Sequence, residues 1–369
     1  MAYQTLNLIA ASDDLTLEEL SYLLAVDLEK GSFDRQNRPL DLYAPIEACT
    51  CLLTLPCNTD TRDLHLAHYT VKEYLNSSRV CKGPAKMYQM TDDSMYSMLA
   101  SCLITYMLYE SYEVEHKPLM PYAITDWYEV FRDINSISAR KSLSGLIIQL
   151  LGPNEPHYQN WRNEVAKALA PTDSPYPIWS AEPGAEPCAT LASLCWFGCI
   201  EAAQLLLDTQ KSPFPFQKPI YWTIPADFLR RMYRPKDLLS GFGHELSKDK
   251  RSKENLLLYL KNEFAGLEAL TVVHVALLWG YDFKPGFLDL MLSKGADINV
   301  RSLTGSSLLN TALNGRTRIR DWVSGWSDDT NLFDFLLANG AQVNPSQCTI
   351  TPLQSAIARA RRSLNPRVV

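Results

Sequence analysis

The sequence has little net charge, no long apolar run and little glycine and proline overall. Its 35 Lys and Arg residues nearly balance 41 Asp and Glu residues, which leaves a net charge of −6 over 369 residues. This balance gives no electrostatic reason to expect nucleic acid or an anionic membrane as a partner. With 46% hydrophobic residues, 16 glycines and 22 prolines, the composition excludes disordered and collagen-like classes and predicts two or three packed domains.

We expect neither a membrane span nor a secretory signal in this sequence. The longest uncharged stretch, Ser94–Tyr109, is too short to cross a bilayer and contains four Ser or Thr residues, so we expect a buried helix. No basic residue precedes the apolar start of the chain. Nine cysteines are an odd number in a chain far above the size of disulfide scaffolds. These features predict an intracellular, cytoplasmic location, with the nucleus as the alternative.

Residues 1–82 have the pattern of a winged-helix domain: three short helices, a β-hairpin and a closing helix. Thr16 and Glu19 have capping-box spacing, in which each side chain accepts a hydrogen bond from the backbone N–H of the other residue. Thr70 and Glu73 have the same spacing and predict the start of the closing helix. Between these pairs the pattern predicts a helix over 46–51 and hairpin strands over 52–55 and 64–67.

Apolar residues at helical spacing predict a helical bundle over residues 88–170. Prolines stand at or between the ends of its helices, where their missing N–H is tolerated. The expected helices are 94–112, 122–134, 140–151 and 158–170. Five prolines then fall within 171–187, which is too many for a helix or a central strand. We therefore predict a semi-rigid linker there.

Residues 188–369 contain an internal repeat, because Gly295-Ala296-Asp297-Ile298-Asn299 recurs as Gly340-Ala341-Gln342-Val343-Asn344 after a second apolar helix end. The units start near Ala189, Thr271, Ser307 and Thr351. These segments resemble ankyrin repeats, whose period is about 33 residues. An insertion at about 209–270 separates the first, degenerate unit from the others. In that unit, Cys195 and Cys199 are expected to share one buried helix face.

Most of the chain resembles the region that follows the nucleotide-binding domain in fungal STAND proteins, the NACHT and ankyrin receptors related to NLRs. The residues that carry this resemblance are Leu15–Leu20, Leu24–Val26, Cys49 with Leu52, Leu66–Leu75, and Pro121–Ala123 with Trp127. The resemblance implies a mostly α fold, with a winged helix and helical bundle followed by a degenerate ankyrin-repeat solenoid. It also implies the sensor half of an intracellular signalling or nonself-recognition receptor.

The phosphate-binding loop G-x-x-x-x-G-K-[ST] occurs nowhere in the sequence, so we expect no bound nucleotide and no other cofactor. Under the resemblance, a nucleotide-binding domain is supplied by another chain or is missing upstream. Repeat stacks offer an extended concave face to other proteins. The predicted function is therefore a non-enzymatic protein-binding or scaffold module, without nucleic-acid or membrane partners.

Three groups of residues that suggest chemistry are interpreted as structural. Five potential zinc ligands lack zinc-finger spacing, and the first two cysteines are expected to pack inward: Cys49, Cys51, Cys57, His65 and His68. His68, Lys72 and Glu73 resemble an acid–base cluster, but no nucleophile accompanies them and Glu73 is expected to cap its helix. The candidate DNA-recognition segment Asp41–Leu55 contains no Lys or Arg to neutralise phosphates.

The predicted partner surface is an insertion of about 11 residues, relative to the ankyrin period, within 314–330. Trp and Arg dominate interface hot spots because they combine large buried area with directional polar contacts. The candidate residues are Arg316, Arg318, Arg320, Trp322 and Trp326, with Arg301 on the concave face as a further candidate. The alternative is that Trp322 belongs to a neighbouring helix and packs inward, while the arginines are solvated.

The competing interpretation is an enzyme of unknown reaction that uses a cleft between the 209–270 insertion and the repeats. The insertion contains the adjacent aromatics Tyr221 and Trp222 and the acids Asp227 and Asp237. A deep polar pocket with perturbed ionisable groups would favour the enzyme, and a flat or packed surface would favour the binding module.

Overall fold

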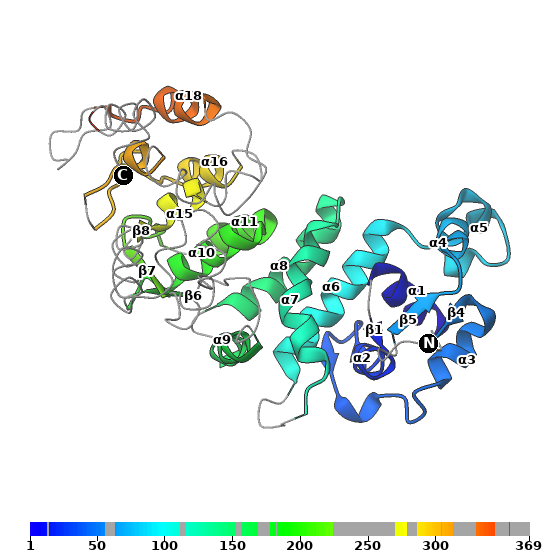
Figure 1. Cartoon of the computed structure of the whole chain (residues 1–369). Coiled ribbons are helices and arrows are strands. Elements are labelled where there is room, and N and C mark those ends of the chain that lie inside the picture. Colours follow the sequence, from blue (N-terminus) through cyan, green and yellow to red (C-terminus); the bar gives the residue numbers. More distant parts are fainter. Residues whose placement is uncertain are drawn as a thin grey trace, which may run out of the picture. The chain divides into compact units, whose positions relative to one another are not determined.

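The structure is a computed structural model of the whole chain. It describes residues 1–12, 15–55, 63–110, 116–152, 156–168, 178–181, 183–210, 212–223, 270–278, 286–303, 305–312, 330–343 and 354. The described part is mostly helical, in agreement with the sequence analysis (Figure 1). Unit 1 comprises residues 1–151 and 155–168, and unit 2 comprises 152–154 and 169–369. The segments predicted as a winged-helix domain and a helical bundle thus lie in one compact unit.

The first half of unit 1 consists of a small antiparallel sheet and the short helices around it. Its helices are α1 (Ala2–Ala11), α2 (Leu17–Leu23), α3 (Ala44–Cys49), α4 (Tyr69–Asn76), α5 (Ser78–Lys82) and the 3-10 turns η1 (Arg35–Asn37), η2 (Thr50–Leu52) and η3 (Lys86–Tyr88). Strands β1 (Leu15–Thr16), β5 (Asp63–Leu66) and β4 (Leu53–Thr54) form the sheet in that order, and β2 (Val26–Asp27) pairs with β3 (Ser32–Phe33). Leu15 pairs with Leu64, and both are buried, so the sheet contributes to the core.

One predicted capping box is confirmed and the other is wrong. The Glu19 amide donates to Thr16 Oγ1 at 3.2 Å, and the Thr16 amide donates to Glu19 Oε2 at 2.8 Å. Helix α4 begins at Tyr69 instead, because the His68 ring nitrogen Nδ1 accepts the Thr70 amide hydrogen at 3.3 Å. An imidazole nitrogen can accept this bond as a hydroxyl oxygen does, so the helix starts before Thr70.

The second half of unit 1 is a bundle of four helices: α6 (Asp92–Tyr109), α7 (Leu119–Arg132), α8 (Ile137–Leu151) and α9 (Pro156–Ala168). Helix α6 is buried along most of its length and contacts α1, α7 and α8. Helix α7 starts before Pro121, which occupies the first turn where its missing N–H has no helical partner to lose. Within the described ranges, no helix is both long enough and apolar enough to cross a membrane.

Unit 2 contains a second antiparallel sheet, ordered β6 (Ile178–Ala181), β7 (Pro219–Thr223) and β8 (Leu270–Thr271). Strand β6 lies inside the segment predicted as a linker, so that prediction is wrong for 178–181. It is an edge strand of the sheet, the position where neighbouring prolines are best tolerated. Strands β7 and β8 fall at the two ends of the predicted 209–270 insertion and pair with each other.

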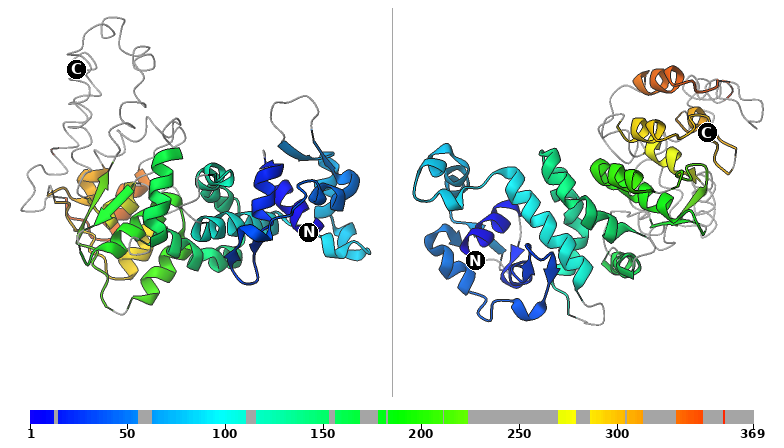
Figure 2. Two further views of the ribbon diagram at one scale, coloured as in Figure 1. Left: turned by 90° about the horizontal axis from the view of Figure 1, so that it is seen from below. Right: turned by 180° about the vertical axis from the view of Figure 1, so that it is seen from behind.

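Helix pairs stack in unit 2, as Figures 1 and 2 show. The helices are α10 (Glu186–Phe197), α11 (Ile200–Thr209), α15 (Val272–Leu278), α16 (Gly286–Ser293) and α18 (Thr330–Ala338). Helix α10 contacts α15, and α11 contacts α16, so the first helices and the second helices of two pairs lie side by side. Cys195 and Cys199 are both buried but do not share a helix face, because left-handed Gly198 ends α10 between them.

Gly295 and Gly340 end the second helix of their units with the same geometry. Both have positive φ, at 92° and 87°, a conformation that glycine adopts without a Cβ clash. The Ala296 amide donates to the Met291 carbonyl at 2.9 Å, and the Ala341 amide donates to the Leu336 carbonyl at 3.0 Å. The repeated sequence therefore forms a repeated helix end.

Candidate protein-binding surface

A tight turn between Arg301 and Ser307 projects from the stacked helices of unit 2. Arg301 and Ser307 form an antiparallel bridge, and the Ser302 amide donates to the Ser306 carbonyl at 3.0 Å. Gly305 has a φ of 80°, which allows the chain to reverse here. The turn leaves the side chain of Leu303 69% exposed. We refer to residues 301–307 as the 301–307 turn.

His274 anchors the 301–307 turn to the preceding helix α15. Its Nε2 lies 3.1 Å from the Ser306 carbonyl oxygen, and its Nδ1 lies 2.8 Å from Thr271 Oγ1. Burial lowers the pKa of His274 from 6.5 to about 4, so the ring is neutral at pH 7. Since a carbonyl can only accept, Nε2 carries the proton and Nδ1 accepts from the Thr271 hydroxyl. Nε2 thus holds the turn, and the bond from Thr271 to Nδ1 orients the ring that does so.

Asn299 links the same region to the next unit of the stack. Its Nδ2 donates to the Gly340 carbonyl at 3.2 Å, and its Oδ1 accepts from the Gln342 amide at 2.8 Å. One amide side chain therefore bonds the loop that follows α16 to the loop that follows α18. The exposed side chains of Leu337 and Val343 belong to that second loop and its helix.

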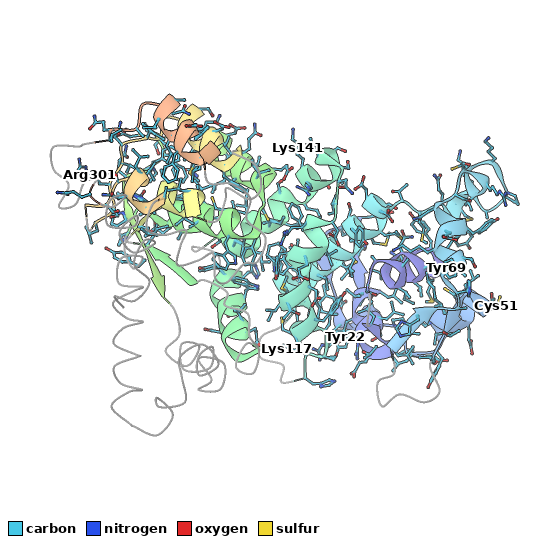
Figure 3. All side chains as sticks on the ribbon, turned by 45° about the horizontal axis from the view of Figure 1, so that its top comes forward. Tyr22, Cys51, Tyr69, Lys117, Lys141 and Arg301 are labelled. Carbon is cyan, nitrogen blue, oxygen red and sulfur yellow. The ribbon has the colours of Figure 1, made fainter. Side chains whose placement is uncertain are left out.

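Arg301 is the one predicted partner-binding residue within the described residues. It is half-buried and lies at the periphery of unit 2 (Figure 3). The other candidates lie outside the described residues: Arg316, Arg318, Arg320, Trp322 and Trp326. Leu303, His274 and Asn299 were not singled out as site residues. The Thr304-Gly305 pair is a turn signal that could have indicated the exposed position of Leu303.

The cysteine and histidine side chains of unit 1 serve different local roles. The Cys49 thiol is buried 3.8 Å from the Ala2 carbonyl oxygen, and burial raises its pKa to about 11. Cys51 lies at the surface (Figure 3), and Cys57 is outside the described residues. In the part of the chain that the structure describes, no three His, Cys, Asp or Glu residues are grouped to hold a metal ion.

The residues that resemble an acid–base cluster in unit 1 have structural contacts. His68 caps α4, and Lys72 Nζ donates to the Ala10 carbonyl at 2.9 Å. Glu73 is exposed on α4 and is not the cap that the sequence predicted. For the alternative enzyme site, Tyr221 and Trp222 lie on β7, whereas Asp227 and Asp237 are outside the described residues.

The most buried carboxylate among the described residues of unit 1 is held by an arginine from a distant segment. The Arg35 Nη2 atom donates to Glu110 Oε2 at 2.9 Å and to the His116 carbonyl at 3.0 Å. The Glu110 side chain is only 2% exposed. The Arg35 guanidinium also lies 5.2 Å from the centre of the Tyr22 ring. These contacts connect η1 to the end of α6, which is a structural role.

Comparison with known proteins gives one partial similarity. No family model matches the chain, and no solved structure matches it. The azaphilone pigments biosynthesis cluster protein L of Monascus ruber is 23% identical over 160 residues. The match covers 40% of this chain and 33% of that protein, so the chain spans about a third of the relative's length.

Proposed function

We propose that the chain is a protein-binding module whose unit 2 is a degenerate ankyrin-type stack. Support comes from the side-by-side helix pairs α10–α11 and α15–α16 and from the matching helix ends at Gly295 and Gly340. The observation that carries the proposal is the 301–307 turn. His274 holds this turn by a hydrogen bond to the Ser306 carbonyl, and the Leu303 side chain is exposed. A fixed turn with an exposed apolar tip loses little conformational entropy when it binds a partner.

The proposed contact surface centres on Leu303 and Arg301 and extends to the candidates within 314–330. An apolar side chain beside a guanidinium suits a protein partner, because one contributes buried area and the other directional hydrogen bonds. The residues of this surface, and not the stacked scaffold, determine which partner binds.

For unit 1 we propose a winged-helix domain joined to a helical linker, as in the fungal STAND receptors that the sequence resembles. The order α1, β1, α2, α3, β4, β5 and the three-stranded sheet support this. Unit 1 would relay partner binding to a nucleotide-binding domain that another chain or an upstream segment supplies. Titration of this chain with ATP and Mg²⁺ should then give no saturable heat, and micromolar binding would contradict this proposal.

The proposed contact surface is tested by affinity purification from a native extract with quantitative mass spectrometry. We expect Leu303→Asp to lower partner recovery by about tenfold or more, because a hot spot of ~2 kcal/mol is lost. The matched control is Leu40→Asp, which changes an exposed leucine of unit 1. Equal recovery with both variants and the wild type, all folded by circular dichroism, would reject the 301–307 turn as the binding surface.

The contribution of the 314–330 segment needs its own variant. Arg318→Ala combined with Trp326→Ala removes one guanidinium and one indole from the predicted surface. If this segment extends the surface around the 301–307 turn, recovery falls in this variant as well as in Leu303→Asp. Unchanged recovery would remove the segment and confine the surface to the 301–307 turn.

A further inference from the structure

Unit 1 contains a pocket of about 460 Å³ that the proposed protein-binding function does not use. One wall comes from α1 and the α3–η2 segment, and the other comes from α4 and the residues around η3. Leu6, Cys49 and Leu75 are buried at the pocket, whereas Ala48 and Tyr74 are exposed. The pocket therefore has a mainly apolar interior and opens to solvent at its rim.

Every described residue that lines this pocket has an uncharged side chain. The Cys49 thiol is also neutral at pH 7, because burial raises its pKa to about 11. The lining residues with hydroxyl groups are Thr50, Thr70, Tyr74 and Tyr88, and Thr70 Oγ1 already lies 2.9 Å from His68 Nδ1. Such a surface can desolvate an apolar molecule and hydrogen-bond a polar group on it. The charge that acts on this surface is the N-terminal ammonium, which lowers the pKa of Cys49 but is outweighed by burial.

The backbone of the pocket wall is strained at Thr50, with a φ of 53° and a ψ of −123°. Among the residues that the structure describes, Thr50 is the sole non-glycine residue with positive φ. This conformation is unfavourable for a β-branched residue, and backbone strain of this kind is concentrated at functional sites such as ligand sites. The strain is a second observation, independent of the pocket's size and lining.

We propose that this pocket binds a small, uncharged and mainly apolar molecule that presents a hydroxyl or carbonyl group to the rim. Its volume falls within the range of roughly 300–1,000 Å³ that is typical of small-molecule sites. A charged ligand would lose its hydration without gaining an ion pair from the lining side chains. A helical peptide would need an extended groove with several anchor positions, and this is a single pocket bounded by four chain segments.

The test uses Nile red, an uncharged apolar dye with a carbonyl group, and follows its fluorescence on titration with the full chain. We expect saturable binding of one dye per chain. Ala48→Trp places an indole at the exposed rim and should weaken binding by about tenfold or more. Ala67→Trp is the matched control, because Ala67 is also an exposed alanine of unit 1 but does not line the pocket. It should leave the affinity within about twofold.

A second variant and a second dye keep the assignment testable if Ala48→Trp fails to fold. Tyr74→Ala removes a half-exposed ring from the opposite wall and should weaken Nile red binding several-fold. The anionic dye 1-anilinonaphthalene-8-sulfonate should bind at least about tenfold more weakly than Nile red.

Four outcomes would overturn the proposal. The first is that Nile red shows no saturable binding, and the second is that the wild type and a folded rim variant bind Nile red with equal affinity. The third is that the anionic dye binds as tightly as Nile red. The fourth is binding of several dyes per chain that are all lost together in Ala48→Trp, which would identify an extended groove for a peptide.

Discussion

The two units of this chain are stabilised in different ways. Unit 1 is built around α6, a helix that α1, α7 and α8 all contact, so segments far apart in the sequence share one core. In unit 2, helix pairs contact neighbouring pairs, and single polar side chains such as His274 and Asn299 bond one loop to the next. In a shared core, one substitution lowers stability throughout the unit. In a stack, the loss of stability is confined to the neighbouring repeats.

The largest effect should come from Phe131→Ala in α7. Phe131 is fully buried in unit 1, so the substitution removes apolar contact and leaves a cavity. We expect a loss of about 3–5 kcal/mol in the free energy of unfolding. Hydrogen exchange followed by mass spectrometry should speed up across α1, α6, α7 and α8 together. Faster exchange confined to α7 would contradict the description of unit 1 as one core, and Tyr69→Ala at the surface is the control.

His274→Leu should have an intermediate effect and a local one. Leucine keeps much of the buried volume but leaves the Ser306 carbonyl and the Thr271 hydroxyl without these bonds, which costs about 2–3 kcal/mol. Exchange should accelerate in α15 and the 301–307 turn and stay unchanged in α6–α8. Acceleration in unit 1 would show that the two units do not respond separately.

The stability of the α15 region should also depend on pH through His274. The folded ring has a pKa of about 4, compared with 6.5 for the ordinary group, so the unfolded chain binds more protons between these values. Stability should therefore be complete above pH 6.5 and decline as the pH falls from 6.5 to 4, by at most about 3 kcal/mol. His274→Leu should flatten this decline between pH 6.5 and 5. An identical pH profile in wild type and variant would disprove the assignment.

Asn299→Ala should give the smallest effect and sharpen the comparison further. It removes two hydrogen bonds between successive loops at a half-buried position, so we expect about 1 kcal/mol. Exchange at the Gln342 amide should increase, while α10 and α11 stay protected as in the wild type. Asn37→Ala, at an exposed position in unit 1, is the matched substitution and should leave the Gln342 amide unaffected.

Local signals in the sequence predicted much of this fold, and tertiary contacts account for the misses. The Thr16–Glu19 cap and the helical character of both units follow from short-range spacing. The prediction of a Thr70–Glu73 cap is wrong because His68 is the N-cap of α4 and accepts the Thr70 amide hydrogen. The strand at 178–181 was missed because its partner, β7, lies about 40 residues further along the chain.

The candidate surfaces were less accessible to sequence reasoning than the fold. Arg301 was proposed from its place in the repeat, but the exposure of Leu303 depends on how the Gly305 turn closes. The unit 1 pocket combines α1, α3, α4 and η3, which no short motif joins. Its uncharged lining cannot be recognised from the sequence, because it forms only where these four segments meet in the fold.

The Arg35–Glu110 pair carries an evolutionary consequence. Loss of Arg35 alone would leave the Glu110 carboxylate, which is 2% exposed, buried without its ion pair, whereas loss of both charges together can be nearly neutral. Natural relatives that retain this junction between η1 and α6 should therefore keep both residues or replace both. Covariation at positions 35 and 110 would then identify relatives that share this packing of unit 1, even where overall sequence identity is low.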